Sequence, residues 1–361
     1  MHRIRVGVLG CGMISQLMHL PYLTESRDLF EVAAVCDRSL DLAESVANRF
    51  HIPRAYSSLD DMLAEEADIH AVLVLNADHV EPILTSVGRG KHVFTEKPLG
   101  YTLAETEEVA RVSERSGITV MVGYMKRFDS GVRRGLAEIA GIARPLAARV
   151  DIVVGPDYGN WIIPELTGIT RSENPRPVED TRRARVEREL KNSHAYALDA
   201  YMDMFGVWSH DINLYRAAFP EHPASIKAHT SRDGKLLTAS LQYADGFQCS
   251  FLGASTSVRR FEESLTVWGE DRTVRIDISN PFLRDTPSVV RVWRDEPDPA
   301  PGQARGNAVE EVITGTHEEA FKAQLKHFHE CVTTDSRPLT DAREAVLDTR
   351  LMIDIVRAAD R

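Results

Sequence analysis

The chain changes its pattern of hydrophobic and polar positions near residue 126. Before that point, short apolar runs rich in β-branched residues alternate with amphipathic stretches. The runs predict buried parallel strands at Ile4–Leu9, Glu31–Cys36, Ala71–Leu75, His92–Phe94 and Thr119–Val122. The amphipathic stretches predict helices at Leu40–Phe50, Ser58–Glu65, Pro82–Arg89 and Leu103–Ser116. Alternation at this spacing predicts βαβ units and a doubly wound parallel sheet, and therefore an α/β fold.

After residue 126 the pattern is that of successive strands without intervening helices. The strands cover 147–154, 224–230, 236–243, 247–254, 263–268, 272–276 and 289–293, and they predict one large, open, mostly antiparallel sheet. Residues 294–308 are rich in Pro and Gly and predict a surface loop, and helical periodicity returns at 318–332 and 342–359. A length of 361 residues fits two domains. We expect them at 1–125 and 126–361, with the C-terminal helix packing back on the first domain.

Residues 179–191 stand out because nine of these thirteen residues are charged, with both signs mixed. Such a mixture is typical of a solvated helix with ion pairs four residues apart. The same segment also suits a lid, or an arm that contacts a second subunit, beside an active site. The sequence leaves both interpretations open.

Charge and cysteine content exclude several classes of protein. Acidic residues exceed basic ones by 54 to 43, which argues against a nucleic-acid partner. The four cysteines are far apart and form no C-x-x-C pair, so neither a zinc site nor a disulfide framework is expected. No segment has the pattern of a secretory signal or about 18 uninterrupted apolar residues, so no membrane partner and a cytoplasmic location are expected.

The first strand leads directly into Gly10-Cys11-Gly12-Met13-Ile14-Ser15, and a helical stretch follows. Glycines at a strand-to-helix turn let the backbone approach a pyrophosphate, and the start of the helix supplies N–H donors. The third glycine of the usual G-x-G-x-x-G pattern is Ser15 here. The context still predicts a dinucleotide site formed by Gly10, Gly12, Met13 and Ile14.

Asp37 closes the second strand, 25 residues after Gly12. A carboxylate in this position accepts hydrogen bonds from the ribose hydroxyls and repels a 2′-phosphate. The sequence therefore favours NAD over NADP. The neighbouring Arg38 can hold a 2′-phosphate or stack on adenine, so NADP stays the alternative.

Several short motifs resemble the glucose-fructose oxidoreductase/inositol dehydrogenase/MocA (Gfo/Idh/MocA) family. They are Asn76-Ala77-Asp78-His79, Glu96-Lys97-Pro98 located 17 positions after His79, Gly123 to Phe128, and Trp208-Ser209-His210-Asp211. The resemblance spans the chain and is strongest over residues 4–130. It implies an N-terminal Rossmann domain and a C-terminal α/β domain whose open sheet packs in oligomers, here a homodimer or homotetramer. It also implies reversible hydride transfer at a sugar or cyclitol carbon.

The same resemblance assigns roles to individual residues. Lys97 matches a lysine near the nicotinamide and the reacting hydroxyl, and His210 matches an acid/base histidine. Both are therefore expected to be catalytic. Asn76, His79, Glu96 and Lys97 are expected to contact the cofactor together with Asp37 and Arg38. The residues expected to bind substrate are Lys97, Tyr124, Tyr158, Trp161, His210 and Asn213.

The chain departs from the family pattern around His210. Gly206 stands where the family commonly has an aspartate one helical turn earlier, and Asn213 stands where it commonly has an aspartate three residues later. Asp199, Asp203 or Asp211 could replace the missing carboxylate. His194, Asp199, Asp203 and His210 match no metal-binding spacing, so no metal site is expected.

Three functions fit these observations. The first is an NAD-dependent dehydrogenase, or the reverse ketosugar reductase, acting on a sugar, glycoside or cyclitol. The second is NAD-dependent elimination, such as glycoside cleavage or dehydration through transient oxidation, which the missing aspartate motivates. The third is a non-enzymatic regulator that binds NAD and a sugar, which Lys97 and His210 argue against.

Overall fold

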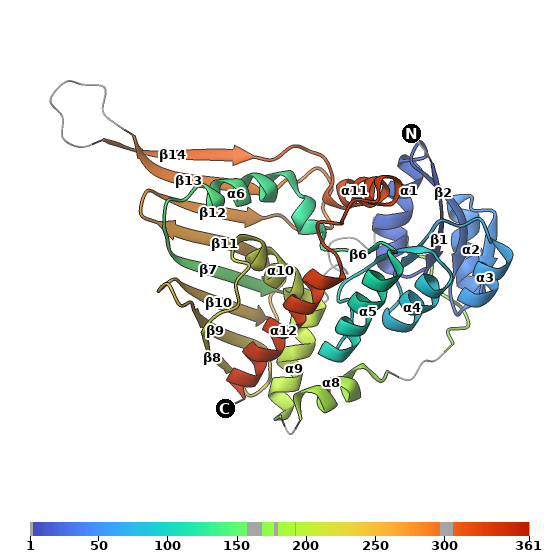
Figure 1. The fold of residues 1–361 in the computed structure, drawn as a ribbon, viewed down its shortest axis with the longest axis horizontal. Helices are drawn as coiled ribbons and strands as arrows, with labels where there is room; N and C mark the ends of the chain where they lie inside the picture. Colours follow the sequence, from blue (N-terminus) through green and yellow to red (C-terminus); the bar gives the residue numbers. More distant parts are fainter. Residues whose placement is uncertain (1–2, 157–167, 177–179, 192, 297–305, 361) are drawn as a thin grey trace. The chain divides into compact units, whose positions relative to one another are not determined.

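The computed structural model describes residues 3–156, 168–176, 180–191, 193–296 and 306–360 (Figure 1). The contacts between residues divide the chain into two compact units. The first unit contains residues 1–124, 163–189 and 321–349, and the second contains residues 125–162, 190–320 and 350–361. Both units are discontinuous, whereas the sequence analysis drew a single boundary after residue 125.

The first unit is built on a six-stranded parallel sheet with strand order β3-β2-β1-β4-β5-β6. The strands are β1 (Ile4–Leu9), β2 (Phe30–Cys36), β3 (Arg54–Tyr56), β4 (Ala71–Val74), β5 (His92–Thr95) and β6 (Val120–Val122). The predicted doubly wound sheet is confirmed, and its strand order is that of a dinucleotide-binding Rossmann fold. Strand β3 was not predicted because it has three residues and starts with an exposed arginine.

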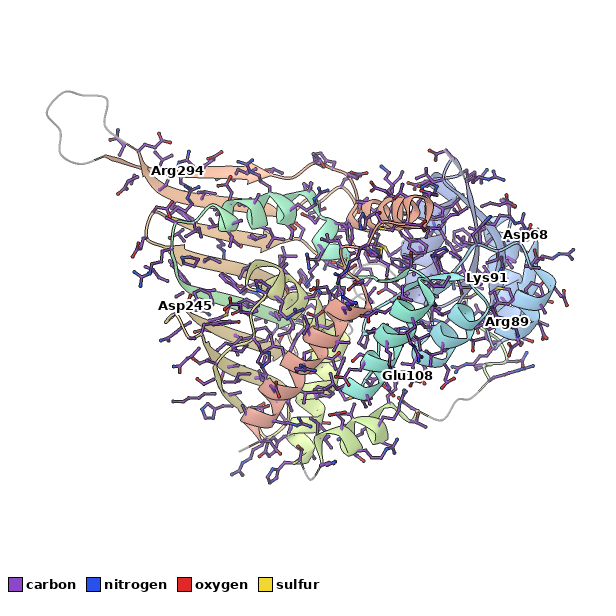
Figure 2. The ribbon with its side chains drawn as sticks, viewed as in Figure 1. Asp68, Arg89, Lys91, Glu108, Asp245 and Arg294 are labelled. Carbon is purple, nitrogen blue, oxygen red and sulfur yellow. The ribbon has the colours of Figure 1, made fainter. Side chains whose placement is uncertain are left out.

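Helices α2 (Leu40–Phe50), α3 (Leu59–Glu65), α4 (Val80–Gly88) and α5 (Leu103–Ser116) connect these strands, close to the predicted bounds. Local chemistry explains the limits of α5. Thr102 and Glu105 form a capping box at its start, and Gly117 ends it with a φ of 70°. Charged side chains such as Asp68, Arg89 and Glu108 point outward from this unit (Figure 2).

The first helix of the unit contains a wide turn. It comprises a π-helical turn, η1 (Ser15–His19), followed by α1 (Leu20–Glu25). Pro21 has no N–H to donate to the carbonyl of Leu17, and the wider π turn relieves the clash that a proline causes inside a regular helix.

One C-terminal segment, residues 321–349, also belongs to the first unit. It includes helix α11 (Ala320–Thr334) and the first part of α12 (Ala342–Ala359). Ala342 and Ala345 of α12 pack into the core of the parallel sheet. Just before them, Thr340 exchanges hydrogen bonds with the backbone of Val122 at 2.7 and 2.8 Å.

The second unit contains an eight-stranded sheet with order β14-β13-β12-β11-β7-β10-β9-β8 (Figure 1). The strands are β7 (Pro145–Val154), β8 (Ser225–Thr230), β9 (Leu236–Gln242), β10 (Gln248–Ser255), β11 (Phe261–Gly269), β12 (Arg272–Ile278), β13 (Val289–Glu296) and β14 (Asn307–Thr314). Only the β7–β10 pair is parallel among these strands, so the predicted open, mostly antiparallel sheet is confirmed.

Two details of the prediction for this half of the chain are wrong. The strands do not follow one another without helices, because α8 (Arg182–Leu190), α9 (Ala195–Asp203), η3 (Met204–Trp208) and α10 (Ser209–Ala218) lie between β7 and β8. Burial on several sides of η3 and α10 hides their helical period in the sequence. The predicted bounds of the loop at 294–308 are also too wide, since residues 294–296 belong to the end of β13 and residues 307–308 to the start of β14.

Helices cover one face of this sheet. Helix α6 (Ser130–Ala140) packs on β12 and β13, α10 on β7, and α9 on β8. Gly253 permits a close approach here, because a Cβ atom on it would lie 2.7 Å from the ring of Trp208. The opposite face carries exposed side chains, among them Arg149, Lys227 and Trp268. None of the described helices combines the length and apolar character needed to span a membrane.

Candidate functional site

The glycine turn after β1 has two different glycines. Gly10 has a φ of +100°, and a Cβ atom on it would lie 2.7 Å from the backbone nitrogen of Asn76. The fold therefore requires glycine at position 10. A Cβ atom on Gly12 would meet nothing within 4 Å among the described residues. Packing does not require glycine at position 12, but open space beside it suits a ligand that approaches the backbone.

Asp37 lies at the carboxyl end of β2 and faces the glycine turn. One carboxylate oxygen accepts a hydrogen bond from the backbone N–H of Cys11 and the other from that of Ser39, both at 3.0 Å. Each oxygen retains a lone pair for a further donor. The carboxylate is partly exposed, as binding to ribose hydroxyls requires, and the side chain of Arg38 beside it is exposed.

Asn76 and His79 follow β4 at the same edge of the sheet. The amide nitrogen of Asn76 donates to the carbonyl of Asp78 at 2.7 Å, while its Oδ1 is buried with no partner among the described residues. The ring of His79 is buried, and its Nδ1 lies 2.5 Å from the carbonyl of Pro98. Burial lowers the pKa of His79, so the neutral ring donates to that carbonyl. His79 thereby fixes the turn that carries Lys97.

The carboxylate of Glu96 connects the first helix to the same turn. Its Oε1 lies 2.8 Å from Nε2 of the buried His19, and its Oε2 accepts a hydrogen bond from the backbone N–H of Lys97 at 3.3 Å. Edge-on packing of His19 against Phe94 and Phe321 holds the imidazole in place. The Lys97 side chain itself is partly buried. The sequence did not indicate that His19 belongs to this group.

Carboxyl ends of parallel strands gather at one edge, so the glycine turn, Asp37, Asn76 and Lys97 lie along the same edge of the first unit. Met13 and Ile14 begin the helix after the turn and are partly exposed. Burial raises the pKa of Cys36 to about 12, and it also raises the pKa of Cys11, in both cases with help from Asp37. The raised pKa values favour the protonated form of both thiols over the nucleophilic thiolate.

His210 lies in the first turn of α10 in the second unit and is partly buried. Its neighbour Asp211 is buried, and both its oxygens accept hydrogen bonds from Nζ of Lys126, at 3.0 and 2.9 Å. Asn213 is also buried and accepts a hydrogen bond from Arg127 at 3.3 Å. The predicted substrate role of Asn213 thus concerns a side chain whose amide oxygen is already used.

Lys126, Asp211 and Glu263 form a buried ion cluster that the sequence did not reveal. Their exposed fractions are 3, 2 and 4%, and the ammonium of Lys126 pairs with both Asp211 and Glu263 of β11. Burial alone would lower the pKa of Lys126, but the two carboxylates outweigh it and raise that pKa. The three residues are 52 or more positions apart in the sequence, so only the fold brings them together.

The expected replacements for the missing aspartate differ in their surroundings. Asp211 is engaged by Lys126. Asp203 accepts a hydrogen bond from Ser255 at 2.7 Å, and burial raises its pKa. Asp199 lies on α9 against Gly234, where a Cβ atom on the glycine would be 2.5 Å from the aspartate Cβ.

The remaining predicted residues divide into two groups. Tyr124 is 2% exposed and belongs to the first unit. Tyr158 and Trp161 lie outside the described residues, so their predicted contact with substrate stays a prediction. Among the described residues, no group of three or more His, Cys, Asp or Glu side chains is arranged to hold a metal ion.

Residues 4–124 match the profile of the Gfo/Idh/MocA proteins, described as an oxidoreductase family with an NAD-binding Rossmann fold. The similarity to the Gfo/Idh/MocA family thus concerns residues 4–124. One curated member, inositol 2-dehydrogenase 3 of Saccharopolyspora erythraea, is 39% identical over 153 residues. That alignment covers 40% of this chain and 44% of the relative, so the chain spans less than half the length of the curated protein it matches.

Solved structures extend the similarity of fold to nearly the full chain. A UDP-N-acetylglucosamine 3-dehydrogenase from Acidithiobacillus ferrooxidans has a TM-score of 0.75 at 15% identity and covers 100% of this chain and 99% of its own. A 3-ketoreductase from Actinomadura kijaniata, determined with NADP and TDP-benzene, has a TM-score of 0.69 at 19% identity over 98% and 96% of the two chains. Both are similar to this chain in fold.

The residues of the first unit fit the dinucleotide that the family name implies. Gly12 opens onto space where a pyrophosphate needs close approach to the backbone. Asp37 keeps acceptor capacity for ribose hydroxyls. The buried, unpartnered Oδ1 of Asn76 suits an amide donor such as a carboxamide, because buried polar atoms are normally paired.

Proposed function

We propose that this protein is an NAD(P)-dependent oxidoreductase that interconverts a CH–OH group and a carbonyl on a sugar, glycoside or cyclitol. The observation that carries the proposal is the row of groups along one edge of the parallel sheet: the glycine turn, Asp37, Asn76 and Lys97. The match of residues 4–124 to an oxidoreductase family with an NAD-binding fold supports it, and so does the likeness to a named inositol 2-dehydrogenase.

The bound nicotinamide supplies the acceptor for a hydride, which carries two electrons from the substrate carbon. The hydroxyl proton must leave at the same time, and residues of this chain accept it. Lys97 polarises the hydroxyl as a hydrogen-bond donor, and His210 accepts the proton as a general base. In the reverse direction His210 returns the proton. The clamps from His79 to Pro98 and from His19 to Glu96 hold the turn carrying Lys97.

NAD is the proposed cofactor rather than NADP. A carboxylate at the end of β2 repels a 2′-phosphate, and Asp37 is held at that position by two backbone N–H groups. The exposed Arg38 next to it favours NADP. A screen with both cofactors separates these alternatives directly.

The proposal is tested by following nicotinamide reduction with NAD and with NADP across monosaccharides, glycosides and inositols. On the substrate found, Lys97→Ala and His210→Ala should each lower kcat by about a hundredfold or more. Lys91→Ala and His222→Asn are the matched controls, because these residues make surface contacts with the carbonyl of Ala67 and with Asp354. Full turnover by both site variants would show that the assignment is wrong.

One observation favours the elimination reaction as a second candidate. Asp211 is already hydrogen bonded to Lys126 and Asp203 to Ser255, and both are carboxylates that could replace the missing aspartate at Gly206. Altered proton handling suits a reaction in which transient oxidation acidifies the neighbouring C–H bond. That proton is removed, and the group on the next carbon, β to the carbonyl, departs to leave a carbon–carbon double bond. In glycoside cleavage water then adds to this double bond, and the hydride finally returns to the carbonyl carbon. Product without net reduced cofactor, with solvent deuterium beside the oxidised carbon, identifies this reaction.

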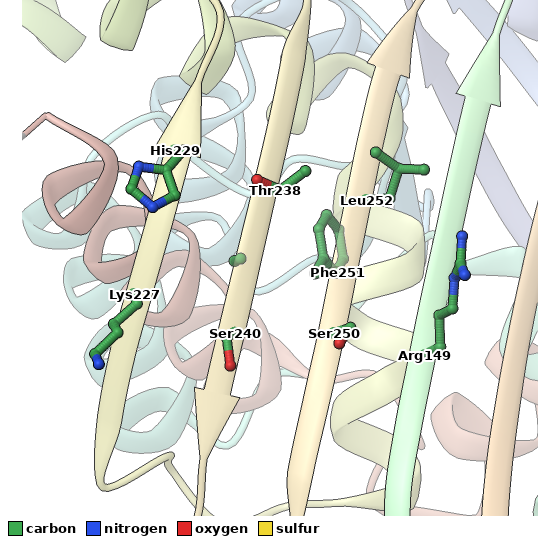
Figure 3. A pocket seen from close by; sticks show the side chains of 9 residues that line it. Arg149, Lys227, His229, Thr238, Ser240, Ser250, Phe251 and Leu252 are labelled. Atoms are coloured by element: carbon green, nitrogen blue, oxygen red, sulfur yellow. The ribbon is translucent and has the colours of Figure 1, made fainter.

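We further propose that the open sheet face binds a second copy of this chain, giving a homodimer or homotetramer. Cross-strand pairs place Arg149, Arg275, Arg291 and Lys227 in one row on this face. Figure 3 shows the part of the face that Arg149, Lys227 and His229 border. Asp151, Asp277 and Glu310 pair with the arginines, so the face carries both charges and can complement a copy of itself.

Light scattering during size-exclusion chromatography tests this assembly. The wild-type chain should elute with the mass of a dimer or tetramer. Trp268→Glu places a charge where a 41% exposed indole lies on the face, and it should yield monomers. A wild-type monomer at micromolar concentration contradicts the proposed assembly.

A further inference from the structure

A stretch from the middle of the chain contacts the helix after the glycine turn. Residues 168–176 belong to the first unit, although they follow β7 in the sequence. The amide of Gln16 and the backbone of Thr170 exchange two hydrogen bonds, each of 2.9 Å. The same amide nitrogen donates to the carbonyl of Cys11 at 2.8 Å. Gln16 therefore connects this stretch directly to the glycine turn.

The same stretch is also fixed beside the end of β2. The carboxylate of Asp41, in the first turn of α2, accepts hydrogen bonds from the hydroxyl of Ser172 at 2.8 Å and from the backbone N–H groups of Glu173 and Asn174 at 2.9 and 3.3 Å. These bonds lower the pKa of Asp41, the Ser172 hydroxyl most of all. Arg176 donates its backbone N–H to the hydroxyl of Ser39 at 3.3 Å. This second attachment lies two residues from Asp37.

Helix α8 supplies a third attachment, after β4. Arg185 makes a two-pronged ion pair with Asp78 at 3.3 and 3.1 Å and bonds to Glu105 at 2.8 Å. Its guanidinium lies over the ring of Tyr101, 5.4 Å from the centroid. Figure 1 shows α8 near α5, whose first turn contains Glu105. The charged segment of the sequence is thus a helix docked by specific ion pairs, not only a solvated one.

The three attachments lie at the carboxyl ends of β1, β2 and β4, which is the edge where a doubly wound sheet binds its dinucleotide. We propose that residues 168–176 and α8 form a strap over this edge that closes on the bound dinucleotide and slows its release. This inference rests on the proposed cofactor function. It assigns Gln16, Asp41 and Arg185 as the residues that latch the strap.

The strap covers the site without filling it. Nothing among the described residues lies within 4 Å of a Cβ built on Gly12, although the strap bonds to Gln16 four residues later. Oδ1 of Asn76 has no partner among the described residues, although α8 binds Asp78 two residues later. The latches thus use side chains next to the cofactor groups and leave those groups available.

Dissociation rates of NADH and NADPH from the intact chain test the strap. The prebound reduced cofactor is chased with excess oxidised cofactor in a stopped-flow instrument, and nicotinamide fluorescence is followed. Asp41→Ala removes three hydrogen bonds to a charged acceptor and should raise the dissociation rate about tenfold. Ser172→Ala removes one of them from the strap side, leaves α2 intact, and should raise the rate about threefold.

Asp60→Ala is the matched control. Asp60 lies in the first turn of α3 as Asp41 lies in that of α2, but it pairs with the surface residue Arg89 at 2.8 Å (Figure 2). Its dissociation rate should stay within about twofold of wild type. Equal rates in Asp41→Ala and Asp60→Ala overturn the strap alone, and tighter binding by Asp41→Ala shows that the strap occupies the site. Absence of binding by wild type and control overturns the cofactor proposal and the strap with it.

Discussion

The edge of the parallel sheet in the first unit and the ion cluster in the second unit present polar groups in opposite ways. At the sheet edge, Gly12 opens onto space and Asn76 keeps a buried oxygen without a partner among the described residues. In the cluster, Lys126 binds Asp211 and Glu263 while all three are buried. Polar groups without a hydrogen-bond or ion-pair partner in the fold indicate a place for a ligand, whereas polar groups that have such partners stabilise the fold.

The largest expected effect on stability comes from a substitution in the ion cluster. Lys126→Met should lower the free energy of unfolding by about 3–5 kcal/mol, because two buried carboxyl groups lose their ammonium partner. Lys322→Met is the control, since Lys322 pairs with Glu25 at 3.1 Å where both are partly exposed. Urea titrations of both variants measure these losses, and Lys322→Met should cost at most about 1 kcal/mol. Equal losses would mean that the cluster does not stabilise the second unit.

A substitution at the sheet edge should change the preference between NAD and NADP. Asp37→Ser removes the carboxylate that repels a 2′-phosphate, so the ratio of kcat/KM with NADP to that with NAD should rise about tenfold. That shift corresponds to about 1.4 kcal/mol of differential binding. Asp68→Ser, on the outer surface, should leave the ratio unchanged (Figure 2). A wild type that already prefers NADP would show that Arg38 outweighs Asp37.

His79 lies at the sheet edge, but its ring already has a hydrogen-bond partner in the carbonyl of Pro98. The pH dependence of stability therefore tests its structural role. Burial lowers its pKa from 6.5, so below that pH the unfolded chain binds a proton that the folded chain does not. Stability should therefore fall as the pH drops below about 6.5, by at most about 1.4 kcal/mol per pH unit. His79→Asn should flatten this part of a melting profile, while His222→Asn should not. The same pH dependence of the melting temperature in both variants would contradict a buried, neutral His79 ring.

The sequence predicted the sheet edge well because each of its parts is local. A glycine turn, an acid at the end of a strand and the Glu96-Lys97-Pro98 motif can each be recognised within a few residues. Most strands of both sheets were found for the same reason, by short hydrophobic runs, whereas β3 and β14 were not predicted.

The residues that the sequence did not reveal depend on contacts between distant segments. His19 reaches Glu96 across 77 positions, Lys126 reaches Asp211 across 85, and Thr170 reaches Gln16 across 154. No local pattern encodes such pairs, because any buried histidine or charged helix has many potential partners. The charged segment at 179–191 illustrates this, since its composition fits a solvated helix and only the fold shows Arg185 on Asp78.

The central claim is that the first unit binds a dinucleotide at the edge beside Gly12. Titration of NADH into Gly12→Val, combined with a thermal melt, tests it most directly. The melting temperature should match wild type because a side chain at position 12 enters open space, whereas Gly10→Ala should destabilise the chain. Wild type should bind NADH, and Gly12→Val should show no measurable binding. Equal binding by Gly12→Val and wild type, or none by wild type, would contradict the claim.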